Sequence, residues 1–299
     1  MNVAGFVEKF YYPTILGSAL VLGVVLIESG FDASLVLPGT GLLFAVTCFL
    51  MEKRFGETER WTLDPVEVRT DVLHALISNT IPTAIFRGVA LAWIVGASAW
   101  ITDRIGFSLW PHRLPLVGQM VFALLVVELV SYGIHRALHR SALWPLHAVH
   151  HCSPRMYFLL SVRKHPLQAF LTYGGRLSAL WLLGIPEDAM TLLLVFTGAN
   201  SYVQHSNVKM DTRAFSWIFA TPDLHRLHHS KRTSEIDSNF GDVLILYDVL
   251  FGTRLPPKDG DVIHDVIGLP EIEVPQTYTS HLKLPFEWRR LHESGSDRA

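Results

Sequence analysis

Residues 114–151, LPLVGQMVFALLVVELVSYGIHRALHRSALWPLHAVHH, join an apolar segment directly to a cluster of histidines. Residues 114–134 contain one charged side chain, Glu128, whereas residues 135–151 contain five histidines. A helix of about 20 apolar residues can cross the hydrocarbon core of a bilayer. This stretch therefore predicts a membrane helix that leads into a histidine-rich segment.

Five further segments are apolar over nearly the length of a membrane span. They are residues 10–27, 33–51, 72–102, 166–186 and 189–208. Six such segments are hard to place in the core of a soluble protein. Residues 33–51 follow residues 10–27 almost at once, which favours a helical hairpin over a signal peptide. Residues 72–102 form either one tilted span or a span with a re-entrant piece. We expect an all-α, polytopic integral membrane protein with about four to six apolar helices.

Lysine and arginine in the short loops predict the orientation of these helices. The turns at residues 28–32 and 187–188 contain neither residue type, whereas the loop at residues 52–71 contains four. The segment after residue 134 is also basic. We expect both basic segments, and with them the histidine cluster, to face the cytosol. The expected location is a bacterial inner membrane, or the endoplasmic reticulum in a eukaryote.

Composition excludes several classes of protein. Charged residues make up 17% of the 299 residues, against about 25% in an average soluble domain, which argues against a disordered chain. The 25 Lys and Arg do not exceed the 27 Asp and Glu, so a nucleic-acid partner is not expected. Two distant cysteines predict neither a disulfide framework nor a cysteine-based zinc site. The unusual feature is the presence of 15 histidines.

The spacing of eight histidines is typical of metal binding. They form one H-x3-H pair and two H-x2-H-H boxes: His135 and His139; His147, His150 and His151; His225, His228 and His229. Residues i and i+4 share a helix face, while adjacent residues diverge by about 100°. Each H-x2-H-H box could therefore serve two metals, or one metal and the groups around it. Imidazole suits Zn, Cu, Fe and Ni, so the metal is not named by its ligands. The alternatives are a pH-sensing cluster, a surface cluster or histidines that only fill space in the packing.

Other titratable residues are weaker candidates. Glu128 lies two helical turns before His135 and is a candidate catalytic residue, because an ionisable group in an apolar helix is costly. Its alternative is a structural hydrogen bond to Tyr132 or to a neighbouring helix. Asp242 and Asp248 could support the metal ligands or serve as caps and surface groups.

Seven single histidines remain. We expect His165 and His205 to bind the metal or to lie close to it. An ordinary surface or structural role is expected for the other five: His74, His112, His264, His281 and His292.

The chain resembles the fatty acid hydroxylase superfamily, the membrane-bound di-iron hydroxylases and desaturases that include the sterol desaturases. The resemblance extends from about residue 116 to residue 255. It is carried by ELVSYGIHRALH (128–139), LWPLHAVHH (143–151), RKHP (163–166), QHSN (204–207), TPDLHRLHH (221–229) and SNFG (238–241). The desaturases of acyl-coenzyme A have similar boxes with different spacing.

This resemblance implies two iron ions that use O2 to hydroxylate or desaturate a lipid taken from the bilayer. It implies that the eight box histidines are ligands and that His205 joins them. Relatives with the fullest ligand set carry a histidine four residues before His205, where this chain has Ser201. Water, His165 or Asn200 could take its place. We expect no fused cytochrome b5-like segment, so a separate reductase, ferredoxin or cytochrome b5 is the expected electron donor.

The expected organisation has three parts: anchor helices in residues 1–113, the catalytic region in residues 114–256 and a polar tail in residues 257–299. The substrate could be sterol-like, fatty acyl or another membrane lipid, and the oligomeric state is open. A zinc-dependent membrane hydrolase is one alternative, although eight histidines exceed its needs and no H-E-x-x-H motif is present. A metal transporter or sensor is the other, but the boxes flank the apolar runs rather than interrupt them.

Overall fold

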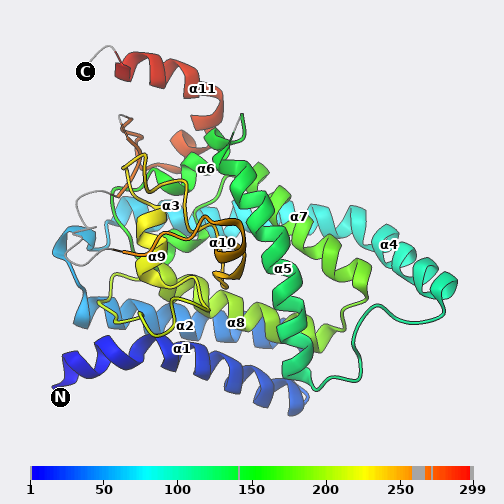
Figure 1. Ribbon diagram of the computed structural model, residues 1–299. Coiled ribbons are helices and arrows are strands. Elements are labelled where there is room, and N and C mark those ends of the chain that lie inside the picture. The colour runs from blue at the N-terminus through cyan, green and yellow to red at the C-terminus, as the bar shows by residue number, and fades with distance from the viewer. Residues whose placement is uncertain (1, 141, 258–266, 271, 297–299) are drawn as a thin grey trace.

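A computed structural model describes residues 2–140, 142–257, 267–270 and 272–296 (Figure 1). Within these ranges the chain is mostly helical and contains no β-strand beyond three isolated β-bridges. The α-helices are α1 (Val3–Glu28), α2 (Ala33–Phe55), α3 (Pro65–Leu73), α4 (Thr80–Ile105), α5 (Leu116–His139), α6 (Trp144–His151), α7 (Pro166–Leu183), α8 (Glu187–His205), α9 (Pro222–His228), α10 (Leu246–Phe251) and α11 (Tyr278–Ser296). Short turns of other helix types are η1 (Glu59–Trp61), η2 (His74–Asn79) and η3 (Phe158–Val162).

Four helical segments in the described part are long and apolar enough to cross a membrane. They are α1, α2, the continuous stretch Pro65–Ile105, and α5. This number lies within the predicted four to six and supports a membrane protein. The two remaining apolar segments of the sequence form α7 and α8, which have 18 and 19 residues.

The first two helices form the predicted hairpin. Residues 29–32 connect them, and the Asp32 carboxylate caps α2 by accepting a hydrogen bond from the Ser34 amide at 2.7 Å. Helix α8 packs against α1, α2 and α5 and is the most enclosed long helix of this bundle. A Cβ atom at Gly23 would lie 2.7 Å from Leu192, so glycine permits the close approach of α1 and α8.

The stretch Pro65–Ile105 is continuous helix interrupted by one π-helical turn, η2. A π turn widens the helix locally and is frequent at functional sites. Here it carries His74 and Ser78, both buried, toward the interior. Beyond it, α4 packs on α7 at the edge of the bundle (Figure 1). Pro82 is the one buried residue of α4, and Trp93 is 82% exposed, so this helix presents an apolar surface to its surroundings.

Shorter elements cover one end of the bundle. Helices α6 and α9 lie there together with the loops around them, and α11 packs on α6 on the side of the molecule away from α1 (Figure 1). Leu284 of α11 is buried against Ala148 and Val149 of α6. Part of the predicted polar tail, residues 258–266, 271 and 297–299, lies outside the described residues. The three domain boundaries stay predictions.

Candidate metal centre

The structure brings nine of the ten predicted metal ligands together in two adjacent groups. One contains five residues, His135, His139, His147, His151 and His228, and the other contains four, His150, His205, His225 and His229. Within each group the nitrogen atoms that could bind a metal lie within 4.8 Å of one another. Eight of the nine side chains are buried, and His135 is half-buried.

Each H-x2-H-H box contributes to both groups. Helix α6 directs His150 into the smaller group and His151 into the larger one, and α9 divides His229 and His228 in the same way. The divergence of adjacent helical residues explains this division. The rings of His151 and His229 stack with their centroids 4.3 Å apart, so the two groups are in direct contact. The spacing allowed each box to serve either two metals or one metal and the groups around it. In the structure each box is divided between two groups, which is the arrangement expected for two metals.

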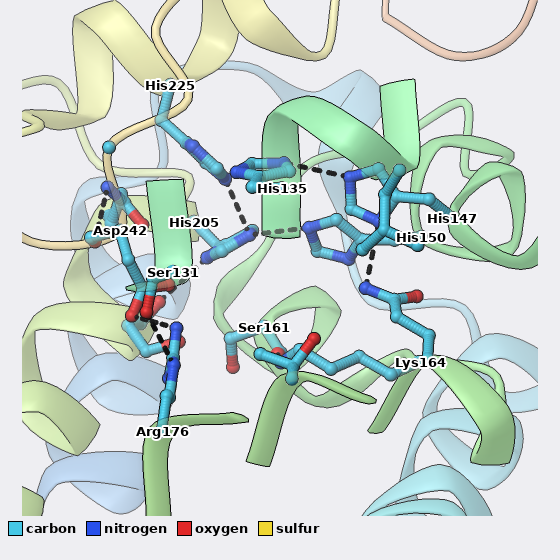
Figure 2. Close-up of a pocket in the computed structure, with 16 residues that line it drawn as sticks. Ser131, His135, His147, His150, Ser161, Lys164, Arg176, His205, His225 and Asp242 are labelled. Atoms are coloured by element: carbon cyan, nitrogen blue, oxygen red, sulfur yellow. Dashed lines mark hydrogen bonds and ion pairs between the residues drawn. The ribbon is translucent and has the colours of Figure 1, made fainter. Parts of the chain in front are cut away.

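The Nε2 atoms point toward one another. The distance between Nε2 of His135 and Nε2 of His147 is 2.9 Å, and the distance between those of His205 and His225 is also 2.9 Å (Figure 2). In the described part of the chain, Nε2 of His139 and Nε2 of His228 are buried without a hydrogen-bond partner. Burying unsatisfied nitrogen atoms is costly, and a bound cation would satisfy them all at once. The donor set therefore fits a pair of metal ions.

Main-chain carbonyl oxygens hold the opposite ring nitrogen of four of the nine histidines. Four histidines donate Nδ1–H to the main chain: His135 to Phe240 at 2.8 Å, His228 to Ser238 at 2.7 Å, His205 to Ser201 at 2.8 Å and His150 to Arg163 at 3.2 Å. Such a bond keeps the proton on Nδ1 and leaves the Nε2 lone pair free for a metal.

Two further histidines have side-chain partners at Nδ1. The Gln168 amide nitrogen Nε2 lies 2.8 Å from Nδ1 of His147 and donates a hydrogen bond to it. His139 donates Nδ1–H to Asp237 at 3.2 Å, and the Asp237 side chain is 54% exposed. His139 thus connects the larger group to the molecular surface.

The loop that supplies two of these carbonyls is fixed by buried carboxylates. Asp248 accepts hydrogen bonds from the amides of Phe240 and Gly241 at 2.8 and 2.7 Å. Glu128 accepts from the amides of Asp242 and Val243 at 2.5 and 3.0 Å. Glu128 therefore holds the loop in place, and its predicted catalytic role stays a prediction.

His165 does not join either group. Its Nδ1 accepts a hydrogen bond from the Leu167 amide at 3.2 Å and caps α7, and its Nε2 lies 3.4 Å from the Leu282 carbonyl oxygen. Asn200 is also occupied elsewhere, with Tyr12 and the Asp242 carbonyl. Neither residue takes the place of the histidine that Ser201 replaces.

The histidines without a predicted metal role are placed as follows. Buried His74 and His281 form a pair in which Nε2 of His74 lies 3.0 Å from Nδ1 of His281, which is a structural contact away from both groups. His112 is exposed. His264 and the side chain of His292 lie outside the described residues.

Burial and neighbouring imidazoles keep the histidines of this centre neutral. In the segments outside the membrane helices, desolvation is the main cause and the nearby rings add to it. The pKa is well below its usual value for His147, His150, His151, His225, His228 and His229. Neutral imidazole is the form that binds a metal.

We predict that the metal-free protein loses stability in acid. A histidine with a lowered folded-state pKa binds a proton more readily after unfolding, so folding is penalised once the pH falls below about 6.5, the ordinary value. The thermal unfolding temperature of chelator-treated protein should therefore decrease as the pH is lowered from 7.5 to 5. Addition of a histidine-binding divalent metal at pH 7.5 should raise that temperature. A midpoint that is constant across this pH range would contradict the neutral cluster.

A pocket opens beside both groups (Figure 2). Its lining includes His135 and His147 of the larger group and His150, His205 and His225 of the smaller one. The other lining residues are Ser131, Leu138, Ser161, Lys164, Gln168, Thr172, Arg176, Ser201, Gln204, Gly241 and Asp242.

Sequence reasoning missed most of these polar lining residues. Three of them, Gln168, Thr172 and Arg176, stand at four-residue intervals on α7 and form one polar face of an apolar helix. That periodicity was visible in the sequence and could have indicated a polar cavity.

The fold and the centre define a helical membrane protein with two buried histidine groups able to hold two metal ions. Residues 120–253 match the fatty acid hydroxylase family. This match supports the resemblance to the fatty acid hydroxylase superfamily that the sequence indicated. The matched residues include all nine histidines of the two groups.

The chain is similar to several lipid-modifying enzymes. Ornithine lipid hydroxylase OlsE of Rhizobium tropici is 28% identical over 240 residues, which cover 79% of this chain and 71% of the relative. Alkylglycerol monooxygenases of Xenopus tropicalis and Danio rerio are 26% and 29% identical over 67% and 74% of this chain. The matches cover 44% and 48% of these two monooxygenases, less than half of each. No solved structure matches the chain significantly.

Proposed function

We propose that the protein is a membrane-bound, oxygen-dependent lipid hydroxylase or desaturase with two iron ions in the histidine groups. The observation that carries this proposal is the pair of adjacent, buried, all-imidazole groups at the end of an apolar helical bundle. The relatives support it, because the matched proteins are named as a lipid hydroxylase and as monooxygenases.

The nine histidines would hold the two ions through Nε2. Imidazole suits iron as well as zinc, copper and nickel, so the ligands alone do not select the metal. The proposed reaction with O2 is the reason to favour iron. When bound, the iron pair supplies the activation of O2 that removes hydrogen from an unactivated carbon. A zinc hydrolase needs three protein ligands and an open position, fewer than either group offers.

The chain itself orients the ligands, keeps them neutral and limits the access of water. Main-chain carbonyls hold the Nδ1 protons of four ligands, and Glu128 and Asp248 fix the loop that carries two of those carbonyls. Because five of the histidines also line the pocket, a substrate carbon placed there would lie against both groups. The pocket is thus the site in which the substrate would react.

The proposal extends to the surroundings of the centre. The histidine groups would face the cytosol, on the side of the basic loops, in a bacterial inner membrane or in the endoplasmic reticulum. A lipid would enter from the bilayer. Electrons would come from a separate reductase, ferredoxin or cytochrome b5. The relatives point to polar membrane lipids, such as an amino-acid lipid or an ether lipid, as the substrate class.

Oxygen labelling tests this function. The chain is expressed under ¹⁸O2 in a host of known lipid composition, and total lipids are compared by mass spectrometry with those of a His228→Ala strain. We expect a lipid that carries one ¹⁸O atom, or one that has lost two hydrogens, only with the wild-type chain. A product whose oxygen comes from water, or one formed equally without O2, would favour the hydrolase instead. Metal uptake by vesicles without any oxidised lipid would favour the transporter.

A further inference from the structure

The pocket beside the histidine groups has polar walls. Of its sixteen lining residues, Leu138 and Gly241 alone lack a polar side chain. Ligand pockets are usually lined mainly by apolar side chains, with a few polar groups that orient the ligand. A plain hydrocarbon segment gains little in such surroundings, because the polar walls lose water without gaining hydrogen bonds. The part of the substrate that enters this pocket should therefore be polar.

Cations outnumber anions by one among the side chains that line the pocket. Arg176 is neutralised by an ion pair with Asp242, in which Nη2 lies 2.6 Å from Oδ2. Lys164 is half-buried, and its Nζ donates a hydrogen bond to the Ser161 carbonyl oxygen at 2.8 Å. No carboxylate of the described residues forms an ion pair with it. Two cations against one anion leave Lys164 without a carboxylate partner among the lining residues; its Nζ lies 5.9 Å from the centroid of the Tyr173 ring.

The main chain holds Lys164 in a fixed place. His74 donates Nδ1–H to its carbonyl oxygen at 3.0 Å. The preceding residue, Arg163, is fully buried and paired with Asp71 at 2.6 Å, and the following residue, His165, caps α7. The ammonium group is therefore tethered to a backbone that is fixed on both sides, which lowers the entropic cost of using it for binding.

We propose that Lys164 binds an anionic oxygen group, a carboxylate or a phosphate, in the headgroup of the lipid substrate. This inference rests on the proposed function and adds the substrate class and the region that reacts. With the headgroup anion on Lys164, a carbon close to the headgroup lies beside the histidine groups. Ser161 and Thr172 line the same pocket and offer hydroxyl groups to a polar headgroup.

The outer face of α7 favours a lipid over a free anion. Leu167 and Leu171 alternate along this helix with the pocket residues Gln168 and Thr172, and they are 54% and 41% exposed. One helix thus presents a polar face to the pocket and an apolar face outward. A lipid with its headgroup in the pocket could lay its chain along that apolar surface.

Binding to the metal-free, detergent-purified full chain tests the proposal without turnover. The probes are N-palmitoylglycine, its uncharged methyl ester, lysophosphatidic acid and inorganic phosphate. We expect wild type to bind at least one of the two anionic lipids about tenfold more tightly than the ester, as a charge-assisted hydrogen bond predicts. Lys164→Met should remove this preference, Lys164→Arg should keep most of it, and Lys209→Met, which removes an exposed lysine paired with Glu8, should change nothing.

The result that would overturn the proposal is specific. The proposal fails if both anionic lipids bind no more tightly than the ester. It also fails if Lys164→Met still binds an anionic lipid more tightly than the ester. Binding of the ester by this variant with wild-type affinity shows that the variant is folded. Inorganic phosphate that binds as tightly as lysophosphatidic acid would show a free-anion site and overturn the headgroup assignment. Because no metal or O2 takes part, failure here is distinct from failure of the ¹⁸O2 experiment, which would overturn the enzymatic function itself.

Discussion

Replacement of His150 or His228 by alanine is expected to abolish turnover and to lower the iron content from two ions per chain toward one. The two residues belong to different groups, so under the proposed function each substitution would remove a ligand from a different ion. Loss of a group that merely supports a metal ligand already lowers affinity or activity by about 10- to 100-fold, and loss of the ligand itself should exceed that. Iron per chain by elemental analysis and the yield of oxidised lipid measure the two effects.

Two matched variants make this prediction specific. His112→Ala removes an exposed histidine and should leave the iron content unchanged. His165→Ala removes the predicted ligand that the structure places outside both groups, and it should also retain two ions. Full iron content and activity in His150→Ala would contradict the assignment of the smaller group. Loss of an ion in His165→Ala would restore His165 as a ligand.

Arg163→Met is expected to cause the largest loss of stability, about 3–5 kcal/mol in the free energy of unfolding. Arg163 is fully buried and pairs through Nε with Asp71 at 2.6 Å and through Nη2 with Glu67 at 3.3 Å. Tyr157 also donates a hydrogen bond to Asp71. Without the guanidinium group, the Asp71 carboxylate would be left buried without its cation. Thermal unfolding of the detergent-purified protein, followed by intrinsic fluorescence, measures the loss.

A double variant separates the ion pair from simple packing. Adding Asp71→Asn to Arg163→Met removes the uncompensated charge and keeps an acceptor for Tyr157, so part of the lost stability should return. If the double variant is less stable than Arg163→Met alone, then the buried charge is not the main cause. Arg155→Met is the comparison at the edge of the same network, where the arginine side chain is 31% exposed, and it should cost less.

The long helices and the ligand set could be predicted from the sequence because both depend on local patterns. Runs of about 20 apolar residues have few stable alternatives to a membrane helix, and α1, α2 and α5 lie where such runs predict them. Histidine spacing identified eight of the nine residues that meet in space, and the ninth, His205, was a candidate as a single histidine; the role of all nine as ligands stays a prediction. Adjacent residues on one helix must diverge, so the division of each box was among the expected arrangements.

What the sequence could not show depends on contacts between distant segments. Asp71 and Arg163 lie 92 residues apart, and no local pattern marks them as a pair. Glu128 was recognised as unusual, but its partners are main-chain amides more than a hundred residues further on. His165 sits beside a proline that begins a helix; it caps that helix and lies outside both histidine groups.

The use of main-chain carbonyls in this centre has a consequence for how it can change over time. Ser201, Ser238 and Phe240 set the protonation of three histidines through an atom that every residue possesses. Side chains at these positions can therefore be exchanged without altering which nitrogen is free, provided that the backbone keeps its course. A centre of this kind tolerates changes of side chain at these three positions while its histidines keep the same free nitrogen.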